Sequence, residues 1–307
     1  MMESWIKRRL LEMGFDDVGI VSLENFPPEE DKRVFLNWLE KGYHADMEYM
    51  ERGKDARLNP NLLLEGAKSA VVVILSYGSK RVGKLKFARY STRKDYHRFF
   101  KKALGKFVKE CKEKFGGEYR VFSDSLPVLE RSLGRLAGIG WIGKNSMLIS
   151  PKFGSYFLIG GFLTTLNLKP DQPFIYDFCG RCNRCVNSCP TGAILEGRII
   201  DSRKCISYWT IEYKGDNIPI DTKGWVFGCD ICQEVCPWNR KATKESKLLP
   251  ILKVFEEIDA IDILSMDEEK FKETFSGTPI MRAKLKGLKR NVLKIAGAGF
   301  EPATSGL

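Results

Sequence analysis

The stretch that decides the fold of this 307-residue chain reads Cys179-Gly-Arg-Cys182-Asn-Arg-Cys185-Val-Asn-Ser-Cys189-Pro190. Its four cysteines are separated by two, two and three residues, and a proline follows the last. A second run, Cys229-Asp-Ile-Cys232-Gln-Glu-Val-Cys236-Pro237, ends in the same way, and Cys205 lies between the runs. Eight of the nine cysteines thus fall within residues 179–236, which indicates one metal-binding or cross-linked unit.

The spacing of the first run is that of iron–sulfur ligands. It matches the bacterial ferredoxin pattern, in which three neighbouring thiolates hold one 4Fe-4S cluster and the fourth reaches a second cluster. Eight thiolates are the complement of two such clusters. The pattern predicts crossed pairing, with these ligand sets: Cys179, Cys182, Cys185 and Cys236 on one cluster; Cys189, Cys205, Cys229 and Cys232 on the other.

Zinc and disulfides are the alternatives for so many cysteines. Structural zinc usually takes two pairs of ligands, often with histidine, whereas both histidines here, His44 and His97, lie far upstream. Disulfide frameworks suit small secreted chains, and no N-terminal segment resembles a signal peptide. We therefore expect a cytoplasmic protein with reduced thiols, and we interpret Cys111 as an isolated thiol in a Lys-rich helix.

The charge balance favours a polyanionic partner. Lys and Arg total 50 against 39 Asp and Glu, a net charge of +11, and such an excess attracts nucleic acid, although basic surfaces also occur without it. Candidate phosphate contacts are Lys101, Lys102, Lys106 and the stretch from Arg282 to Arg290, although such residues more often form a solvated helix face. No apolar run approaches the roughly 18 residues of a membrane span, so we expect no membrane partner, and we expect a monomer.

Sequence patterns divide the chain into four parts: an α/β domain (1–167), the ferredoxin-like domain (168–245), C-terminal helices (246–297) and a disordered tail (298–307). The apolar runs Ala70–Leu75 and Ser155–Leu163 predict buried strands, and a further strand is predicted over Ser146–Ile149. An amphipathic helix is predicted over Phe99–Phe115, a helix or lid over residues 43–57, and a linker over residues 168–178.

A glycine-rich block, Ala137-Gly-Ile-Gly-Trp-Ile-Gly-Lys-Asn145, contains the string G-x-G-x-x-G. This string invites a dinucleotide-binding interpretation, but no suitable βαβ unit surrounds it. A loop that packs against a large planar ligand fits the glycines as well.

Several blocks together resemble the epoxyqueuosine reductases, in that family's order over roughly residues 1–295. They are Asp124–Arg131, Ala137–Asn145, Cys179–Ile194, Cys205–Glu212 and Gly228–Asn239, with Ala88–Tyr90 and Asp95–His97 upstream. The resemblance implies a cobalamin-dependent oxidoreductase with two 4Fe-4S clusters, which reduces epoxyqueuosine to queuosine at the wobble position of tRNA. It also implies an α/β domain akin to cobalamin-processing and flavin-reductase-like proteins, and an external low-potential donor such as flavodoxin or ferredoxin.

The resemblance places the family's proton donor at Asp124, which follows a short predicted strand over residues 119–122. Such a role requires burial to raise the pKa of the carboxyl. The alternative is an N-cap for a helix that begins near Leu126.

Other residues are candidate cobalamin contacts, beside Asp124 itself: Arg57, Tyr90, His97, Trp141, Lys144, Asn145, Ser207 and Tyr208. For each there is an ordinary alternative. His97 fits a solvated position at a helix start, Lys144 and Asn145 fit a turn, and Trp141 fits the core. Ser207 and Tyr208 fit packing around the cluster ligand Cys205.

Two rival functions remain open on the sequence. One is an electron-transfer subunit without a substrate of its own, which would not need the α/β half. The other is a corrinoid reductase acting on a small molecule. Such enzymes usually carry a twin-arginine signal, whereas Arg8-Arg9 here lies in an amphipathic helix.

Overall fold

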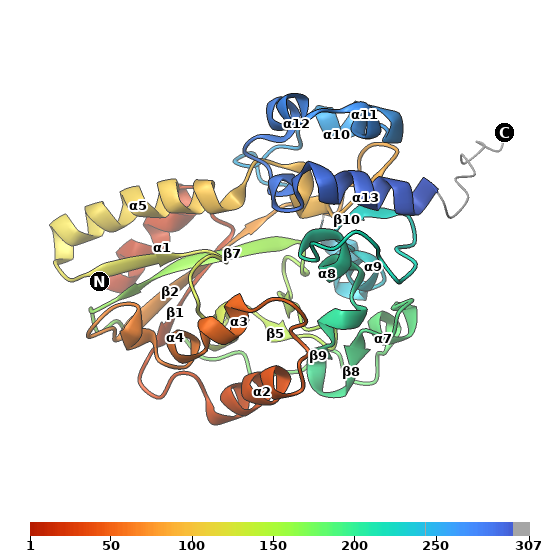
Figure 1. Cartoon of the computed structure of the whole chain (residues 1–307). Coiled ribbons are helices and arrows are strands. Elements are labelled where there is room, and N and C mark those ends of the chain that lie inside the picture. Colours follow the sequence, from red (N-terminus) through yellow and green to blue (C-terminus); the bar gives the residue numbers. More distant parts are fainter. Residues whose placement is uncertain (243, 297–307) are drawn as a thin grey trace.

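A four-stranded antiparallel sheet is the frame of the N-terminal half in the computed structural model, which describes residues 1–242 and 244–296 (Figure 1). The strand order is β1 (Asp17–Ser22), β2 (Ser69–Ser76), β7 (Phe157–Thr164) and β4 (Tyr119–Phe122). All eight residues of β2 are buried because β2 pairs with β1 on one side and β7 on the other. Both predicted buried strands are confirmed.

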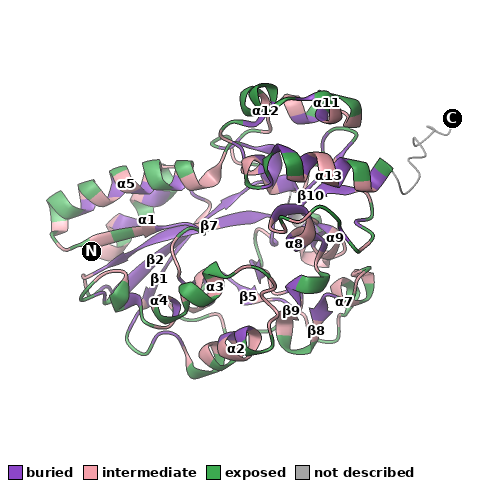
Figure 2. Cartoon of the chain, viewed as in Figure 1, coloured by how far each residue is buried: buried purple, intermediate pink, exposed green. Residues whose placement is uncertain are grey.

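Helices cover one face of this sheet. Ile6 and Leu10 of α1 (Met2–Glu12) pack with Phe100 and Leu104 of α5 (Tyr96–Phe115) against alternate strand residues such as Val71. Figure 2 shows the buried sides of both helices turned toward the strands. Burying such a large apolar layer contributes most of the stabilisation of this half.

The opposite face carries α6 (Glu130–Leu136) and a short hairpin of β5 (Trp141–Ile142) and β6 (Leu148–Ile149). Leu133 and Leu148 meet Val72 and Ile74 in the core there. Below this face in Figure 1 lie α2 (Glu29–Glu40), α3 (Tyr49–Arg52) and α4 (Lys54–Leu58). The helices α3 and α4 occupy most of residues 43–57, for which a helix or lid was predicted.

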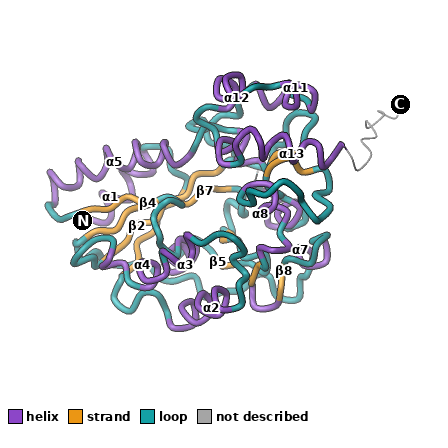
Figure 3. The backbone as a smooth tube through the Cα atoms, viewed as in Figure 1, coloured by secondary structure: helices purple, strands orange, loops and turns teal. Residues whose placement is uncertain are grey.

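The cysteine-bearing segment consists of short elements joined by loops (Figure 3). They are α7 (Arg184–Ser188), β8 (Ile194–Leu195), β9 (Ile199–Ile200), α8 (Ile206–Ile211), β10 (Trp225–Phe227) and α9 (Ile231–Glu234). β10 pairs in parallel with β3 (Lys86–Phe87), so this segment shares hydrogen bonds with the first half of the chain.

Four further α-helices follow within the described residues: α10 (Val254–Glu257), α11 (Ala260–Ser265), α12 (Glu268–Phe275) and α13 (Lys284–Ala296). Their core joins Phe275 and Leu288 to Phe87 and Phe227. The predicted tail, residues 298–307, lies outside the described residues. None of the helices in the described part of the chain has the length and apolar character needed to cross a membrane.

Three local predictions differ from the structure. The predicted helix starts at Tyr96 rather than Phe99, because the carboxylate of Asp95 accepts a hydrogen bond from the His97 backbone. The predicted strand 146–149 is shortened to Leu148–Ile149, since Ser146 has a φ of 62°. The predicted linker 168–178 is held in place: Asp171 accepts a hydrogen bond from the Ile20 N–H, and Phe174 donates one to Arg135.

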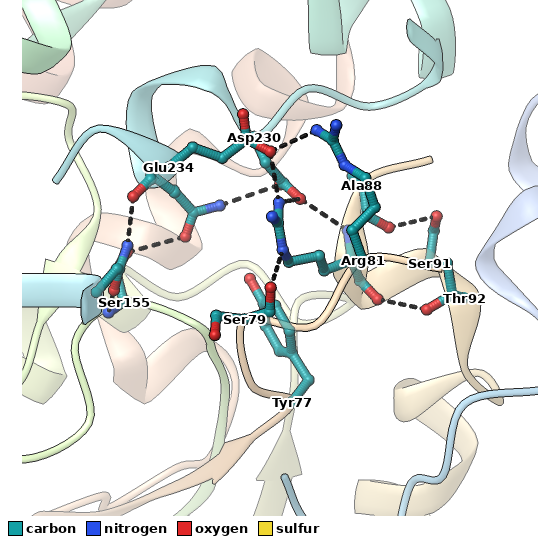
Figure 4. Close-up of polar contacts among 12 residues, drawn as sticks. Tyr77, Ser79, Arg81, Ala88, Ser91, Thr92, Ser155, Asp230 and Glu234 are labelled. Atoms are coloured by element: carbon teal, nitrogen blue, oxygen red, sulfur yellow. Dashed lines mark hydrogen bonds and ion pairs between the residues drawn. The ribbon is translucent and has the colours of Figure 1, made fainter. Parts of the chain in front are cut away.

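A buried ion pair fixes the cysteine-bearing segment to the first half of the chain. The Nη1 of Arg89 lies 3.0 Å from Asp230 Oδ2 and 2.8 Å from Glu234 Oε1, and the Arg89 backbone N–H donates to Asp230 as well. The side chains of Arg89 and Asp230 are only 10% and 2% exposed. Figure 4 shows Asp230 and Glu234 at one side of this network and Ser79, whose carbonyl accepts a hydrogen bond from Arg89 Nε, at the other. Asp230 lies next to Cys229, so the pair also positions a cysteine loop.

We expect Arg89→Met to lower the free energy of unfolding by about 3–5 kcal/mol, because it leaves the buried Asp230 carboxylate without its cation. Arg81→Met is the matched control, since Arg81 pairs with the same Glu234 at a more exposed position; it should cost at most about 1 kcal/mol. Anaerobic chemical denaturation followed by tryptophan fluorescence measures both. Equal losses in the two variants would show that the buried pair has no special role.

Candidate redox and proton-transfer site

One group of four cysteines surrounds a cavity at the surface of the cysteine-bearing segment. Its members, here called the outer cysteine group, are Cys179, Cys182, Cys185 and Cys236. Each of the other three thiolates would raise the pKa of Cys185 by its charge, after the larger effect of burial. Mutual repulsion of this kind is relieved when iron binds the thiolates. The group is the set expected for one cluster.

The remaining four cysteines, the inner cysteine group, also lie near one another: Cys189, Cys205, Cys229 and Cys232. Burial raises the pKa of Cys229 to about 12, and the charges of Cys205 and Cys189 add to that effect. Burial also raises the pKa of Cys232. The charges of Cys229 and Cys205 add to this rise, with a further contribution from Cys185 of the outer group. The two groups are therefore neighbours.

The donor sets fit clusters better than single ions or disulfides. All nine cysteines are free thiols. Within residues 1–242 and 244–296, no three His, Cys, Asp or Glu side chains meet closely enough to hold one metal ion. A 4Fe-4S cluster binds each thiolate through a different iron, so its ligands stand farther apart than those of one zinc ion.

The glycine-rich block lies against the outer cysteine group. The indole Nε1 of Trp141 donates to Cys179 Sγ at 3.4 Å, and Lys144 Nζ donates to the Gly180 carbonyl at 2.9 Å. Asn145 is 3% exposed and its Nδ2 has no hydrogen-bond partner among the described residues. Their predicted contacts with the corrin stay predictions; what the structure shows is contact with the cysteine loop.

Ser207 and Tyr208 lie at the inner cysteine group. Their backbone N–H groups point to the Cys205 sulfur, and they oppose the rise in its pKa that burial causes. The Tyr208 hydroxyl donates to the Asp46 carboxylate in the loop before α3. Both residues therefore support the cluster ligand, and their predicted contact with the corrin is not tested by this arrangement.

Asp124 stands in the loop that leaves β4, with a φ of 57°. Left-handed backbone is uncommon outside glycine and often marks a functional position. The Asp124 Oδ2 accepts a hydrogen bond from Tyr96 Oη at 3.0 Å and lies 3.1 Å from His97 Nε2. The N-cap alternative is wrong, because α6 begins only at Glu130 after a cap at Leu129.

A chain of polar groups continues behind Asp124. The other ring nitrogen of His97, Nδ1, lies 2.7 Å from Asp95 Oδ1, so two carboxylates bracket the imidazole. Burial alone would lower the pKa of His97, but its hydrogen bonds to Asp124 and Asp95 outweigh burial and raise the pKa to about 9. At neutral pH the proton therefore sits on His97.

The pKa of Asp124 itself is lowered, which corrects the expectation of a raised value. Burial acts to raise it, but the hydrogen bond and charge of His97 and the hydroxyl of Tyr96 act more strongly in the other direction. Glu130 behaves oppositely: burial, reinforced by the charge of Asp124, raises its pKa to about 8. Its Oε1 accepts a hydrogen bond from the Asp124 backbone N–H. Glu130, unlike Asp124, is thus protonated at neutral pH.

The side chains of Asp124, Glu130 and Arg131 combine partial exposure to solvent with protein atoms on most sides. The side chain of Asp124 is 65% exposed, and Arg131 is exposed as well. Nevertheless burial is the largest single influence on the pKa of Asp124, Glu130 and Arg131. We infer that they line a recess that water reaches but protein surrounds.

Two predicted contacts lie around the same recess. Arg57 is 8% exposed, and the charges of Tyr49, Asp124 and Glu130 partly offset the lowering of its pKa by burial. The Tyr90 ring lies 6.2 Å from that of Tyr96. Burial raises the pKa of Tyr90, and Asp124 adds to the rise.

Sequence reasoning missed three contributors, Tyr49, Tyr96 and Glu130, and named Arg282 only as a candidate phosphate contact. Tyr96 and Glu130 lie inside the family-like blocks, so their positions were visible but their roles were not. Arg282 stacks over the Tyr49 ring at 5.6 Å and binds Glu212 at 2.7 Å. No local signal connects residues so distant in sequence.

Comparison with known proteins gives two matching family models. The model described as a 4Fe-4S double cluster binding domain matches residues 178–239. The model described as epoxyqueuosine reductase QueG matches residues 57–125, which include Asp124.

Individual proteins match over nearly the whole chain. An epoxyqueuosine reductase of Cyclobacterium marinum is 42% identical over 299 residues, which is 94% of each chain. A crystal structure of an epoxyqueuosine reductase with an epoxyqueuosine-modified tRNA-Tyr stem loop has a TM-score of 0.80 at 26% identity, covering 95% of this chain and 80% of that one. The Bacillus subtilis enzyme, with the loop of its catalytic aspartate swung out of the active site, has a TM-score of 0.79 at 26% identity and the same coverage.

We expect Cys236→Ala to reduce bound iron from about eight to about four atoms per chain, because the outer group loses one of its four ligands. Cys111→Ala is the control: Cys111, on α5, is fully buried in the core and far from both groups in sequence. Iron analysis and electron paramagnetic resonance on anaerobic protein distinguish the variants. Full iron in the Cys236 variant would contradict the grouping.

Proposed function

Because the chain belongs to the epoxyqueuosine reductase family, we propose that it reduces epoxyqueuosine in tRNA to queuosine, with two 4Fe-4S clusters and cobalamin as cofactors. The observation that carries this proposal is the position of Asp124. It ends a hydrogen-bonded chain from Asp95 through His97, inside the inferred recess. An electron-transfer subunit would have no use for such an acid–base chain.

The reaction sets the requirements that the site must meet. Converting an epoxide to an alkene consumes two electrons and two protons and releases one water molecule. Iron–sulfur clusters supply electrons singly, and cobalamin, when bound, supplies a low-valent metal that can engage the substrate. The protein must therefore deliver two protons at one point.

The residues around Asp124 fit a corrin and its amide rim. Arg57, Arg131 and Glu130 offer donors and acceptors for amides, and the aromatic rings of Tyr49 and Tyr90 offer flat apolar surface. We propose that these five residues and His97 would hold the cofactor beside Asp124. We further propose that residues 1–167 form a domain of the cobalamin-processing, flavin-reductase-like type.

Tyr90 links this recess to the inner cysteine group. Tyr90 and Cys229 both pack against the small apolar cluster of Ala88, Ile206 and Trp225. Tyr90 also contacts Tyr96, whose hydroxyl donates to Asp124. A short packed path of this kind keeps the metal centres close to the substrate. We propose that the inner group holds the cluster nearer to the reaction.

The two protons have two sources beside Asp124. His97 and Glu130 have pKa values of about 9 and about 8, so both are protonated at neutral pH. Asp124 Oδ2 touches the imidazole directly. We propose that Asp124 passes the His97 proton to the epoxide oxygen, and that Glu130 provides the second proton.

For tRNA, the structure favours α13 over α5 as a phosphate contact. Arg282, just before α13, interacts with Tyr49 at the recess. Farther along, a groove is lined by Lys286, Lys289, Arg290 and Lys294, together with residues 216–218. Phosphate binding along this groove would leave the wobble nucleotide near Asp124. We propose further that the enzyme acts as a cytoplasmic monomer, supplied by a flavodoxin or ferredoxin.

We expect Asp124→Asn to retain both cofactors and to lose at least about 100-fold in turnover of epoxide-containing tRNA, because the amide cannot transfer a proton. Ser125→Ala, in the same loop, should keep wild-type turnover. Mass spectrometry of the nucleosides from digested tRNA gives the rates, and absorbance gives cofactor content. Full activity of Asp124→Asn would remove this residue from the mechanism.

We also expect activity to fall at alkaline pH. The proposed donors are active when protonated, and a raised pKa keeps His97 charged until the pH exceeds about 9 and Glu130 neutral until about 8. The rate should thus be level near neutral pH and decline through this window. In wild type the rate should begin to fall near the Glu130 value of about 8 and fall more steeply above the His97 value of about 9, whereas in His97→Gln only the first fall should remain. An unchanged profile in that variant would contradict the role of His97.

A further inference from the structure

An exposed apolar segment lies directly before the first cysteine of the outer group. Ile175, Tyr176 and Phe178 are 78%, 63% and 44% exposed. Phe178 also lines the cavity of the outer cysteine group. Exposed patches of large apolar side chains mark interaction sites. This patch borders a proposed redox centre.

Aromatic rings connect this surface to a cluster ligand. Tyr176 stacks on Phe178 with ring centroids 5.9 Å apart, and Phe178 stacks on Trp238 at 5.4 Å. Trp238 meets the buried Trp141 at 4.9 Å, and the Trp141 indole donates to Cys179. The stack holds the exposed rings in place, so a partner that covers them comes close to the cluster without reordering the surface.

The surroundings of these rings are basic. Arg181 and Arg184 are exposed, and Arg184 and Lys144 line the cavity together with Phe178. The nearby carboxylate of Asp177 is balanced by Arg198 at 2.6 Å. An apolar centre with a basic rim complements an acidic protein surface. A second copy of this chain would instead bring arginine against arginine.

We propose that Ile175, Tyr176, Phe178, Arg181 and Arg184, here called the aromatic–arginine face, dock a small acidic one-electron carrier protein. The proposal rests on the proposed function, and it deepens it by assigning the entry point of electrons. Cys229 of the inner group packs against the same apolar cluster as Tyr90, which borders the recess, whereas the outer group adjoins this face. Electrons therefore enter at the outer group and leave from the inner one.

The transfer itself is simple. In each encounter the carrier is oxidised by one electron and the cluster of the outer group is reduced by one electron, and no bond forms or breaks. Two encounters supply the two electrons that one epoxide consumes. Electrostatic attraction accelerates such encounters at low salt and loses its effect as salt screens the charges.

The test follows cluster reduction by stopped-flow absorbance, without tRNA, using fully reduced flavodoxin as the carrier and dithionite as a small reductant. Arg181→Glu/Arg184→Glu should slow reduction by flavodoxin at least about tenfold and abolish its salt dependence. Ile175→Ser/Tyr176→Ser should slow it without changing the salt dependence. Reduction by dithionite should stay within about twofold of wild type in both variants, which shows that the clusters are intact.

The matched control is Lys109→Glu/Lys272→Glu, which changes charge equally on α5 and α12, far from α7 (Figure 1); it should behave as wild type. Equal flavodoxin rates in all proteins would overturn the proposal. So would loss of tRNA binding in the arginine variant, or a wild-type dimer that the Ile175→Ser/Tyr176→Ser variant abolishes. Turnover of tRNA driven by dithionite tests the proposed function separately, since it needs no carrier.

Discussion

The buried ion pair between Arg89 and Asp230 is the interaction on which the rest of the structure depends. Arg89 precedes Tyr90, which borders the Asp124 recess, and Asp230 follows Cys229 of the inner cysteine group. One contact between two side chains that are almost fully buried therefore sets the position of the cysteine loops relative to the proton-transfer residues. A buried pair tolerates little displacement, because separating the charges leaves each one uncompensated.

Proton delivery follows a different rule. Asp124 is an anion in the resting structure because His97 and Tyr96 stabilise its charge. The protons reside on His97 and Glu130, on either side of it. A carboxylic acid holds its own proton at neutral pH where burial and a neighbouring anion disfavour its charge, as at Glu130, whereas a carboxylate fed by an imidazolium can stay ionised in the same recess. This arrangement suits a site that must admit a nucleotide.

The sequence predicted the features that local patterns encode. The spacing of eight cysteines predicted two ligand groups, and the apolar run Ala70–Leu75 predicted the central strand. The family-like blocks pointed to Asp124 and His97. Contacts across long separations were not predictable: nothing near Arg89 indicates Asp230, 141 residues later, and nothing near Trp141 indicates Cys179. The lowered pKa of Asp124 depends on Tyr96 and His97 at the start of α5. The sequence predicted this start three residues too late, so it did not indicate these two residues as partners of Asp124.

The central claim is that electrons stored in the clusters of the two cysteine groups reduce an epoxide that lies beside Asp124. The most direct measurement is a single turnover with cobalamin-loaded protein, prereduced and freed of excess reductant, mixed anaerobically with tRNA that carries the epoxide. Rapid-freeze electron paramagnetic resonance follows cluster oxidation while nucleoside analysis follows queuosine. The account predicts that the clusters lose about two electrons for each queuosine formed, at matching rates. Queuosine formed while the clusters stay reduced would contradict it.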